Sequence, residues 1–235
     1  MVLSAQNVEI RRHTSDSPWN YSALDCRQRE IAERARGGAV GAVLLSEVSP
    51  VITCGRRTAA TDLLLSPEQL AGRGVELYRT DRGGLATYHG PGQWVLFVVD
   101  RLEALTGDRR GVRLAVEGLL NIGLEVGRLY DTRTEIRTGA EMGVWSKRGK
   151  IASVGVHIER GVLLHGLAVN GFRTENSFVG LRPCGLDAPV DYLLSDVAED
   201  VRGAAFEKLG QALISRVFQQ FWRSSCAEQG SFLAG

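Results

Sequence analysis

Three segments of this chain hold residues whose types and spacing could do chemistry. The first, residues 82–93, places an arginine, a histidine, a proline and four glycines between two predicted strands. Glycine-rich loops let a ligand approach the backbone closely and expose amide donors. An ordinary hairpin loop has the same composition, so this segment alone does not separate a ligand loop from a plain turn. It is not a phosphate loop, because it has neither G-x-x-x-x-G-K-[ST] nor a G-x-G-x-x-G that leads into a helix.

The second segment runs through residues 149–156 and is followed by residues 165–170. Side chains alternate between the two faces of a strand, so Lys150 and Ala152 are expected to share one face. A lysine that opens a strand is usually exposed to solvent. A histidine within an apolar strand, such as His165, is more typical of a hydrogen-bonded core residue than of a ligand. Neither residue indicates a site by itself.

The third segment, residues 178–186, contains a cysteine between a proline and a glycine. Pro183 restricts the residue before it to extended geometry, and Gly185 leaves room beside the thiol of Cys184. The pattern predicts a cysteine at a rigid turn, where a nucleophile is reachable. A tripeptide is too short to establish that role alone.

The other cysteines, Cys26, Cys54 and Cys226, have no such context. The chain has no C-x-x-C pair and no zinc-ribbon spacing, so no metal site is predicted. In a reducing cytosol we expect thiols rather than disulfides. Buried free cysteines are mostly inert small hydrophobes, and Cys54 is interpreted in that way.

Composition excludes several classes of protein. The 235 residues are 44% hydrophobic, and 28 basic residues stand against 27 acidic ones. This is enough for one large core, and the charge balance gives no footprint for nucleic acid. No apolar run reaches the roughly 18 residues of a membrane span. The N-terminus lacks the basic and apolar regions of a secretory signal, so we predict a cytoplasmic protein with no membrane partner.

Helix signals recur along the chain. Residues 17–18 (Ser-Pro) resemble an N-cap with proline at the first helical position, and glycines 37–38 would end that helix. Residues 66–69 repeat this chemistry for a short helix with a capping box. Apolar residues at helical spacing predict further helices over 108–126 and 206–221.

The remaining apolar runs predict strands that come in hairpin clusters rather than in alternation with helices. This pattern favours an α+β fold with a mixed, largely antiparallel sheet and packed helices. We expect one domain over residues 1–235, frayed beyond about residue 224. The predicted strands are 39–48, 51–53, 75–79, 85–88, 93–100, 143–146, 151–159 and 162–170.

Together, these segments resemble the octanoyltransferase family, lipoyl(octanoyl) transferases with the catalytic-domain fold of biotin and lipoate protein ligases. Their order and spacing match as well, and weaker agreement extends from residue 50 to about residue 194. The resemblance rests on Arg82-Gly83-Gly84-x-x-Thr87-Tyr88-His89-Gly90-Pro91-Gly92-Gln93, on Gly149-Lys150-Ile151-Ala152, on His165-Gly166-Leu167-Ala168-x-Asn170 and on Pro183-Cys184-Gly185.

The resemblance implies a role for each matched position. Cys184 would be the acyl-thioester nucleophile, and Lys150 would lower the pKa of its thiol and move protons. Backbone amides near Gly155 or Gly185 would stabilise the oxyanion. The residues that would line the acyl tunnel and orient the carbonyl are Arg82, Gly83, Gly84, Leu85, Ala86, Thr87, Tyr88, His89, Ser153, Val154, Gly155, Gly166, Leu167 and Ala168.

The implied reaction moves an octanoyl group from octanoyl-acyl-carrier protein to a lysine of a lipoyl domain. The acceptors would be lipoyl domains of 2-oxoacid dehydrogenase complexes and the glycine cleavage H protein. Thioester to amide is downhill, so no ATP, cofactor or metal is implied. We expect the acidic carrier domains to contact four basic residues, Arg56, Arg57, Lys147 and Arg148.

One residue departs from the family pattern. After Gln93 the chain continues with Trp94 and a run of apolar residues, where the family tends to show a tyrosine-proline ending. We therefore expect Trp94 to narrow or reshape the mouth of the pocket.

Three alternatives stay open. An ATP-dependent lipoate-protein ligase shares the fold but carries an Arg-Arg-x-x-Gly-Gly-Gly loop, whereas Asp81 precedes Arg82 and only two glycines are adjacent here. A non-catalytic acyl- or lipoyl-domain-binding module would keep the tunnel without turnover. A cysteine hydrolase would need His89 or His165 as base, but no protease signature surrounds either one.

Overall fold

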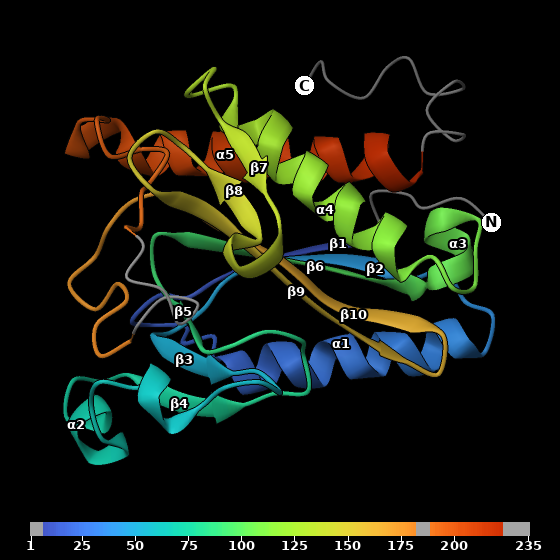
Figure 1. Ribbon diagram of the computed structural model, residues 1–235, viewed down its shortest axis with the longest axis horizontal. Helices are drawn as coiled ribbons and strands as arrows, with labels where there is room; N and C mark the ends of the chain where they lie inside the picture. Colours follow the sequence, from blue (N-terminus) through green and yellow to red (C-terminus); the bar gives the residue numbers. More distant parts are fainter. Residues whose placement is uncertain (1–6, 182–188, 223–235) are drawn as a thin grey trace.

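A seven-stranded sheet forms the centre of the protein (Figure 1), whose computed structural model describes residues 7–181 and 189–222. Only β1 and β2 are parallel, and every other neighbouring pair in this sheet is antiparallel. The predicted α+β class with a mixed, largely antiparallel sheet is therefore confirmed. In spatial order the strands are β1 (Val8–Arg12), β2 (Ala42–Glu47), β6 (Gln93–Arg101), β10 (Val162–Asn170), β9 (Lys150–Glu159), β8 (Gly143–Trp145) and β7 (Glu135–Arg137).

Helices cover both faces of this sheet. Helix α1 (Tyr21–Arg36) packs on one face, and α4 (Val112–Gly127) and α5 (Glu199–Phe221) pack on the other (Figure 1). The short α3 (Leu102–Thr106) follows β6 directly. Strand alternation divides β6 between two cores. Side chains of one parity join the core with α4 and α5, namely Trp94, Leu96 and Val98, and those of the other parity pack toward α1, namely Val95, Phe97 and Val99.

A second, three-stranded sheet has the order β4-β3-β5. Its strands are β3 (Val51–Cys54), β4 (Glu76–Arg79) and β5 (Thr87–His89), with α2 (Pro67–Ala71) packed beside them and the 3-10 turn η2 (Ala60–Asp62) between β3 and α2. The predicted capping box of α2 is confirmed, because Ser66 Oγ accepts from Gln69 N and Gln69 Oε1 accepts from Ser66 N.

The loop between β4 and β5 joins the two sheets. Gly83 N donates to Val156 O of β9 at 2.9 Å, which fixes the loop to the large sheet. On its other side, Arg56 N and Arg57 N donate to the carbonyls of Arg82 and Gly84. The glycine-rich segment is therefore held from both sides.

The start of α1 differs from the prediction. Its N-cap is Asn20, whose Oδ1 accepts from Ala23 N at 2.9 Å, and Ser17 lies in a preceding turn closed by Thr14. The Ser-Pro pair was therefore the wrong cap, since asparagine is an equally strong cap three residues later. Helix α3 and the edge strands β1 and β7, each of five residues or fewer, were not predicted.

In the part of the chain that the structure describes, the helices are too short or too polar to cross a membrane.

A substitution at Trp94 tests the packing of β6 on α5. The ring of Trp94 stacks on Phe206 with centroids 4.5 Å apart, and its Nε1 donates to Phe206 O at 2.8 Å. We expect Trp94→Phe to lower the free energy of unfolding by about 1–3 kcal/mol, because a hydrogen bond and part of a packed ring are lost. Urea denaturation measures this. The same change at the partly buried Trp19, whose bond to Ser46 Oγ is 3.3 Å, should cost less; an equal cost at both positions would contradict the assignment.

Candidate active site

A cavity of about 700 Å³ lies where the glycine-rich loop meets β6, β9 and β10. Every predicted substrate-binding residue except Tyr88 lines it, and so does Lys150. These residues are far apart in sequence, and the fold brings them together around the cavity. Apolar side chains complete the lining, among them Val95, Phe97, Val116 and Met142. Such a lining suits a hydrocarbon chain.

Tyr88 lies outside the lining for a simple reason. Thr87 and His89 face the cavity, and the residue between them in β5 must face the opposite side. Its ring packs against Phe178, with centroids 5.4 Å apart, in the core of the small sheet. It therefore supports the loop from behind.

Trp94 also lies away from the cavity. It belongs to the face of β6 that packs on α5, whereas its neighbour Val95 and the next residue of that parity, Phe97, line the cavity. The expectation that Trp94 narrows the pocket mouth is wrong. Because most residues of β6 are buried on both faces, the sequence had no polar alternation to reveal its orientation.

Lys150 is buried although it opens a strand, with 6% of its surface exposed. Its Nζ lies 5.7 Å from the centre of the Trp145 ring, a cation–π geometry. Gly143 makes room for it, since a Cβ there would lie 2.3 Å from Lys150 Cε. The sequence did not indicate this place for Gly143, because the contact is made across β8 and β9.

The backbone of Lys150 meets the segment that returns from the predicted nucleophile. Cys184 lies outside the described residues, as do the other residues from 182 to 188. On the near side of that gap Leu181 forms a bridge with Leu63. On the far side, Lys150 N donates to Pro189 O at 2.9 Å, and Asp191 N donates to Lys150 O at 3.0 Å. The chain thus re-enters the described structure directly beside the predicted catalytic lysine.

Arg82 organises the glycine-rich loop from within. Its buried guanidinium donates to the carbonyls of Gly83, Leu85 and Thr53, and to Thr53 Oγ1, at 2.7–3.0 Å. Gly155 leaves space for this side chain, because a Cβ there would lie 3.1 Å from Arg82 Cδ. A buried cation at the wall also disfavours further positive charge nearby.

The positive charge of Arg82 acts on His89. This histidine is buried, and burial together with the neighbouring Arg82 lowers the pKa of His89 to about 3. Its Nδ1 lies 2.6 Å from Gln93 Oε1, and its ring stacks on Tyr21 with centroids 5.5 Å apart. Gln93 Nε2 in turn donates to Asn170 Oδ1 at 2.9 Å.

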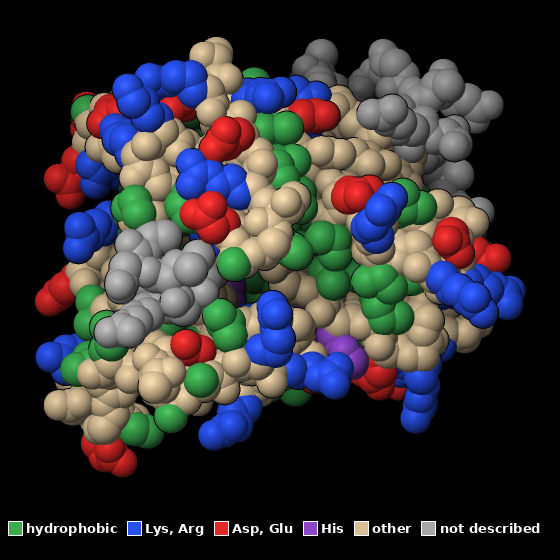
Figure 2. Space-filling view, viewed as in Figure 1, with side chains coloured by type: hydrophobic (Ala, Val, Ile, Leu, Met, Phe, Trp, Pro, Cys, Tyr) green, Lys and Arg blue, Asp and Glu red, His purple; other side chains and the backbone are tan. Residues whose placement is uncertain are grey.

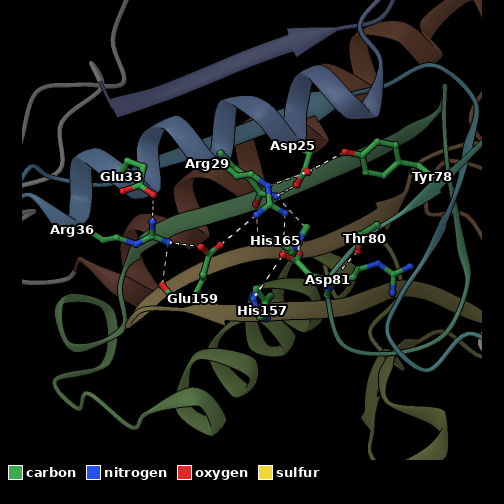
Figure 3. Close-up of polar contacts among 12 residues, drawn as sticks. Asp25, Arg29, Glu33, Arg36, Tyr78, Thr80, Asp81, His157, Glu159 and His165 are labelled. Atoms are coloured by element: carbon green, nitrogen blue, oxygen red, sulfur yellow. Dashed lines mark hydrogen bonds and ion pairs between the residues drawn. The ribbon is translucent and has the colours of Figure 1, made fainter.

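His165 lies in a second polar network, on the α1 side of the cavity (Figure 3). Its Nε2 donates to Asp81 Oδ1 at 2.9 Å, so its Nδ1 accepts from Tyr21 and Gln28. Burial lowers the pKa of His165, and the hydrogen bond from His165 lowers the pKa of Asp81. The sequence-based view of His165 as a hydrogen-bonded core residue agrees with this geometry, although the residue also lines the cavity.

The same network contains three groups that could hold a metal ion, Asp81, His157 and Glu159. Arg29 already contacts both carboxylates, at 2.9 Å to Asp81 and 3.3 Å to Glu159 (Figure 3). A guanidinium therefore supplies the positive charge that a metal would bring. The geometry is that of an ion-pair cluster which ties α1 to the loop and to β9.

The four basic residues expected to contact carrier domains have different surroundings. Arg57 is exposed at the cavity lining, and Arg56 and Lys147 are exposed as well. Arg148 is exposed too, but its guanidinium is paired within the chain with Asp191 and Asp196. On the face that Figure 2 shows, basic and acidic side chains are interspersed, in line with the balanced composition.

Solved structures that are similar in fold to this chain include lipoate protein ligases. A lipoate-protein ligase A bound with ATP has a TM-score of 0.63 and 14% identity, over 90% of this chain and 85% of that chain. LipL1 of P. falciparum, solved with lipoate, has a TM-score of 0.64 and 13% identity, over 96% of this chain and 64% of that chain. Residues 20–214 match the model of the lipoyl protein ligase A/B catalytic domain. The fold and its cavity thus define the class of lipoate ligases and transferases.

Sequence relatives narrow that class. Octanoyltransferase of Koribacter versatilis is 39% identical over 190 residues, covering 77% of this chain and 74% of the relative. Octanoyltransferase of Novosphingobium aromaticivorans is 32% identical over 222 residues, covering 92% and 93%. The chain belongs to the octanoyltransferase family.

The low pKa of His89 predicts a pH dependence of stability. The unfolded chain binds a proton at this histidine below about pH 6.5, whereas the folded protein does so only near pH 3. Stability should therefore fall as the pH drops through this window, by about 1.4 kcal/mol per pH unit from this residue. Urea denaturation at pH 7, 6 and 5 should give a shallower decline for His89→Asn than for wild type. Equal slopes would show that His89 titrates normally.

Proposed function

We propose that this chain transfers an octanoyl group from octanoyl-acyl-carrier protein to a lysine of lipoyl domains, through a thioester on Cys184. Membership of the octanoyltransferase family is the observation that carries this proposal. The buried Lys150 at the wall of a largely apolar cavity supports it. The acceptors are lipoyl domains of 2-oxoacid dehydrogenase complexes and of the glycine cleavage H protein.

In the first half-reaction, the Cys184 thiolate attacks the carbonyl carbon of the donor thioester. A nearby ammonium favours a thiolate, and Lys150 supplies that ammonium. A new C–S bond forms to Cys184, and the old C–S bond to the carrier breaks. The departing thiolate takes a proton from Lys150, which becomes neutral. The products are octanoyl-Cys184 and the free carrier thiol.

In the second half-reaction, the ε-amine of the acceptor lysine attacks the new thioester. A C–N bond forms, the C–S bond to Cys184 breaks, and neutral Lys150 accepts the proton that the amine loses. Cys184 leaves as a thiolate beside the restored ammonium. The cycle returns the site to its starting charge and consumes no ATP.

The cavity surroundings support Lys150 in this role. Its backbone is paired on one side with residues 189–191, which follow Cys184 in the chain. The ATP-dependent ligase is the weaker alternative, because the relatives named above are octanoyltransferases and the ligase loop is absent. Arg57, at the cavity lining, is our first choice for contact with an acidic carrier.

Intact-protein mass spectrometry tests the function. We expect wild type mixed with octanoyl-acyl-carrier protein to gain one octanoyl group, sensitive to hydroxylamine and removed by an apo-lipoyl domain. Cys184→Ser should gain none, and Lys150→Arg should gain it at least about 100-fold more slowly, because the proton donor is lost. Acylation that needs free octanoate and ATP would establish the ligase instead; no acylation by either route would leave the binding module.

Gly143→Ala tests the position of Lys150. The added Cβ would overlap Lys150 Cε, and the φ of +152° at this residue is itself unfavourable for alanine. We expect the rate of adduct formation to fall at least about tenfold, because small displacements of a reacting group are costly. Gly203→Ala is the control, since nothing lies within 4 Å of its Cβ position in α5. Equal rates for the two variants would show that Gly143 does not position the lysine.

A further inference from the structure

The backbone of β9 has one edge that points away from β10. In an antiparallel strand, the N–H and C=O groups of a residue point to the same side, and this side alternates from one residue to the next. Val156 O accepts from Gly83 N, which lies outside the large sheet, so the backbone groups of Val156 point away from β10. By the same alternation, the backbone groups of Val154 and Ile158 also point away from β10.

This edge has a neighbouring strand only where β9 begins. Strand β8 pairs with β9 at Lys150 and Ala152, and β9 continues past it (Figure 1). In the part of the chain that the structure describes, no hydrogen bond is made by Val154 N, Val154 O or Val156 N. An unpaired edge of this kind is a template for an added extended chain.

The unpaired groups lie beside the cavity rather than on open surface. Val154 and Val156 are partly buried and belong to the cavity lining, whereas Ile158 does not. Apolar side chains such as Leu85 and Met142 line the same cavity. A ligand that covers an N–H group here displaces its water, so the ligand must supply an acceptor to avoid the cost of an unmade bond.

The cavity lining connects this edge to an exposed arginine. Gly83 N donates to Val156 O at 2.9 Å, and the next residue, Gly84, accepts from Arg57 N at 3.1 Å. Arg57 is exposed and belongs to the lining. A guanidinium binds phosphate oxygens well. The wall therefore offers backbone amide groups along β9 and a cation farther along.

We propose that the free edge of β9 at Val154 and Val156 binds the phosphopantetheine arm of the acyl donor through backbone hydrogen bonds to its amides. This inference rests on the proposed function and names how the donor is recognised. The amides of the arm accept from Val154 N and Val156 N and donate to Val154 O, as an added strand does. The phosphate of the arm contacts Arg57.

The order of groups along the wall supports this occupant. From the thioester outward, the arm contains two amides, an apolar dimethyl segment and a phosphate. The wall leads from Lys150 through Val154 to Val156, and then through the glycine-rich loop to Arg57. The arm is thin enough to lie along a partly buried edge, whereas a folded carrier domain is not.

Proline variants test the backbone groups directly. Proline lacks an N–H group, and an edge strand tolerates it where the N–H points outward. Val154→Pro and Val156→Pro each remove one proposed donor. Ile158→Pro is the matched control, because it removes an N–H of the same edge beyond the cavity lining. Circular dichroism melts report whether each variant folds.

The experiment measures dissociation constants by isothermal titration calorimetry in proteins that also carry Cys184→Ala, so that no adduct on this residue forms. The probes are octanoyl-phosphopantetheine and octanoyl-mercaptoethanol, a thioester without amides or phosphate. The readout is the preference for the first probe over the second. We expect Val154→Pro and Val156→Pro each to reduce this preference about three- to tenfold, because one hydrogen bond is lost, and Ile158→Pro to keep it.

A second comparison does not depend on proline. We expect Arg57→Ala to weaken the binding of octanoyl-phosphopantetheine about three- to tenfold more than that of octanoyl-pantetheine, which lacks the phosphate. Equal effects on both probes would contradict the place given to the phosphate, and would decide against the proposal if the proline variants do not fold.

Other results would also overturn the assignment. The wild-type preference in both Val154→Pro and Val156→Pro would do so, as would an equal loss in Ile158→Pro. An unchanged preference with slower transfer from the octanoyl-enzyme to an apo-lipoyl domain would place the acceptor backbone at this edge instead. The proposed function is tested separately by adduct formation, so expected binding ratios without an adduct in wild type would reject the thioester route and keep the binding site.

Discussion

The side-chain amide of Asn170 is the contact on which the geometry of the site depends. Its Nδ2 donates to the carbonyls of Lys150 and Asp191, and its Oδ1 accepts from Gln93. One buried group thereby fixes the start of β9, the segment that follows residues 182–188, and the side chain of Gln93. Each of these bonds lies in a buried environment, where an unmade bond costs about 1–3 kcal/mol. The arrangement is therefore strongly specified.

On the α1 side of the cavity the polar groups must also have partners, and there ion pairs take the place of amide hydrogen bonds. Arg29 neutralises Asp81 and Glu159, and Asp81 in turn accepts from His165. Burial and nearby Arg82 keep both histidines at the cavity neutral. On the α1 side, the polar groups of the wall are therefore joined to one another by hydrogen bonds and ion pairs. An apolar acyl chain can lie against it without displacing a solvated ion.

Much of this site was predictable because it is local in sequence. The glycine-rich loop, the short α2 with its capping box and the β9–β10 hairpin follow from turn and cap chemistry within a few residues. The orientation of Trp94 was not predictable, because a strand buried on both faces has no alternation to read. The burial of Lys150 was also missed, since the ring and the glycine that enclose it come from β8. These contacts are set by the register between strands, which one sequence does not fix.

Two glycines of the site leave room for the side chains of other residues. At Gly143 the missing Cβ is the volume that Lys150 occupies, and at Gly155 it is the approach path of Arg82. Both cations are thereby brought into a wall that would otherwise consist of backbone and hydrocarbon. Burying a cation is costly unless its contacts are precise, so the space must match the side chain closely. It follows that each of these glycines forms one structural unit with the charged residue that occupies its space, and that changing either should disturb the other.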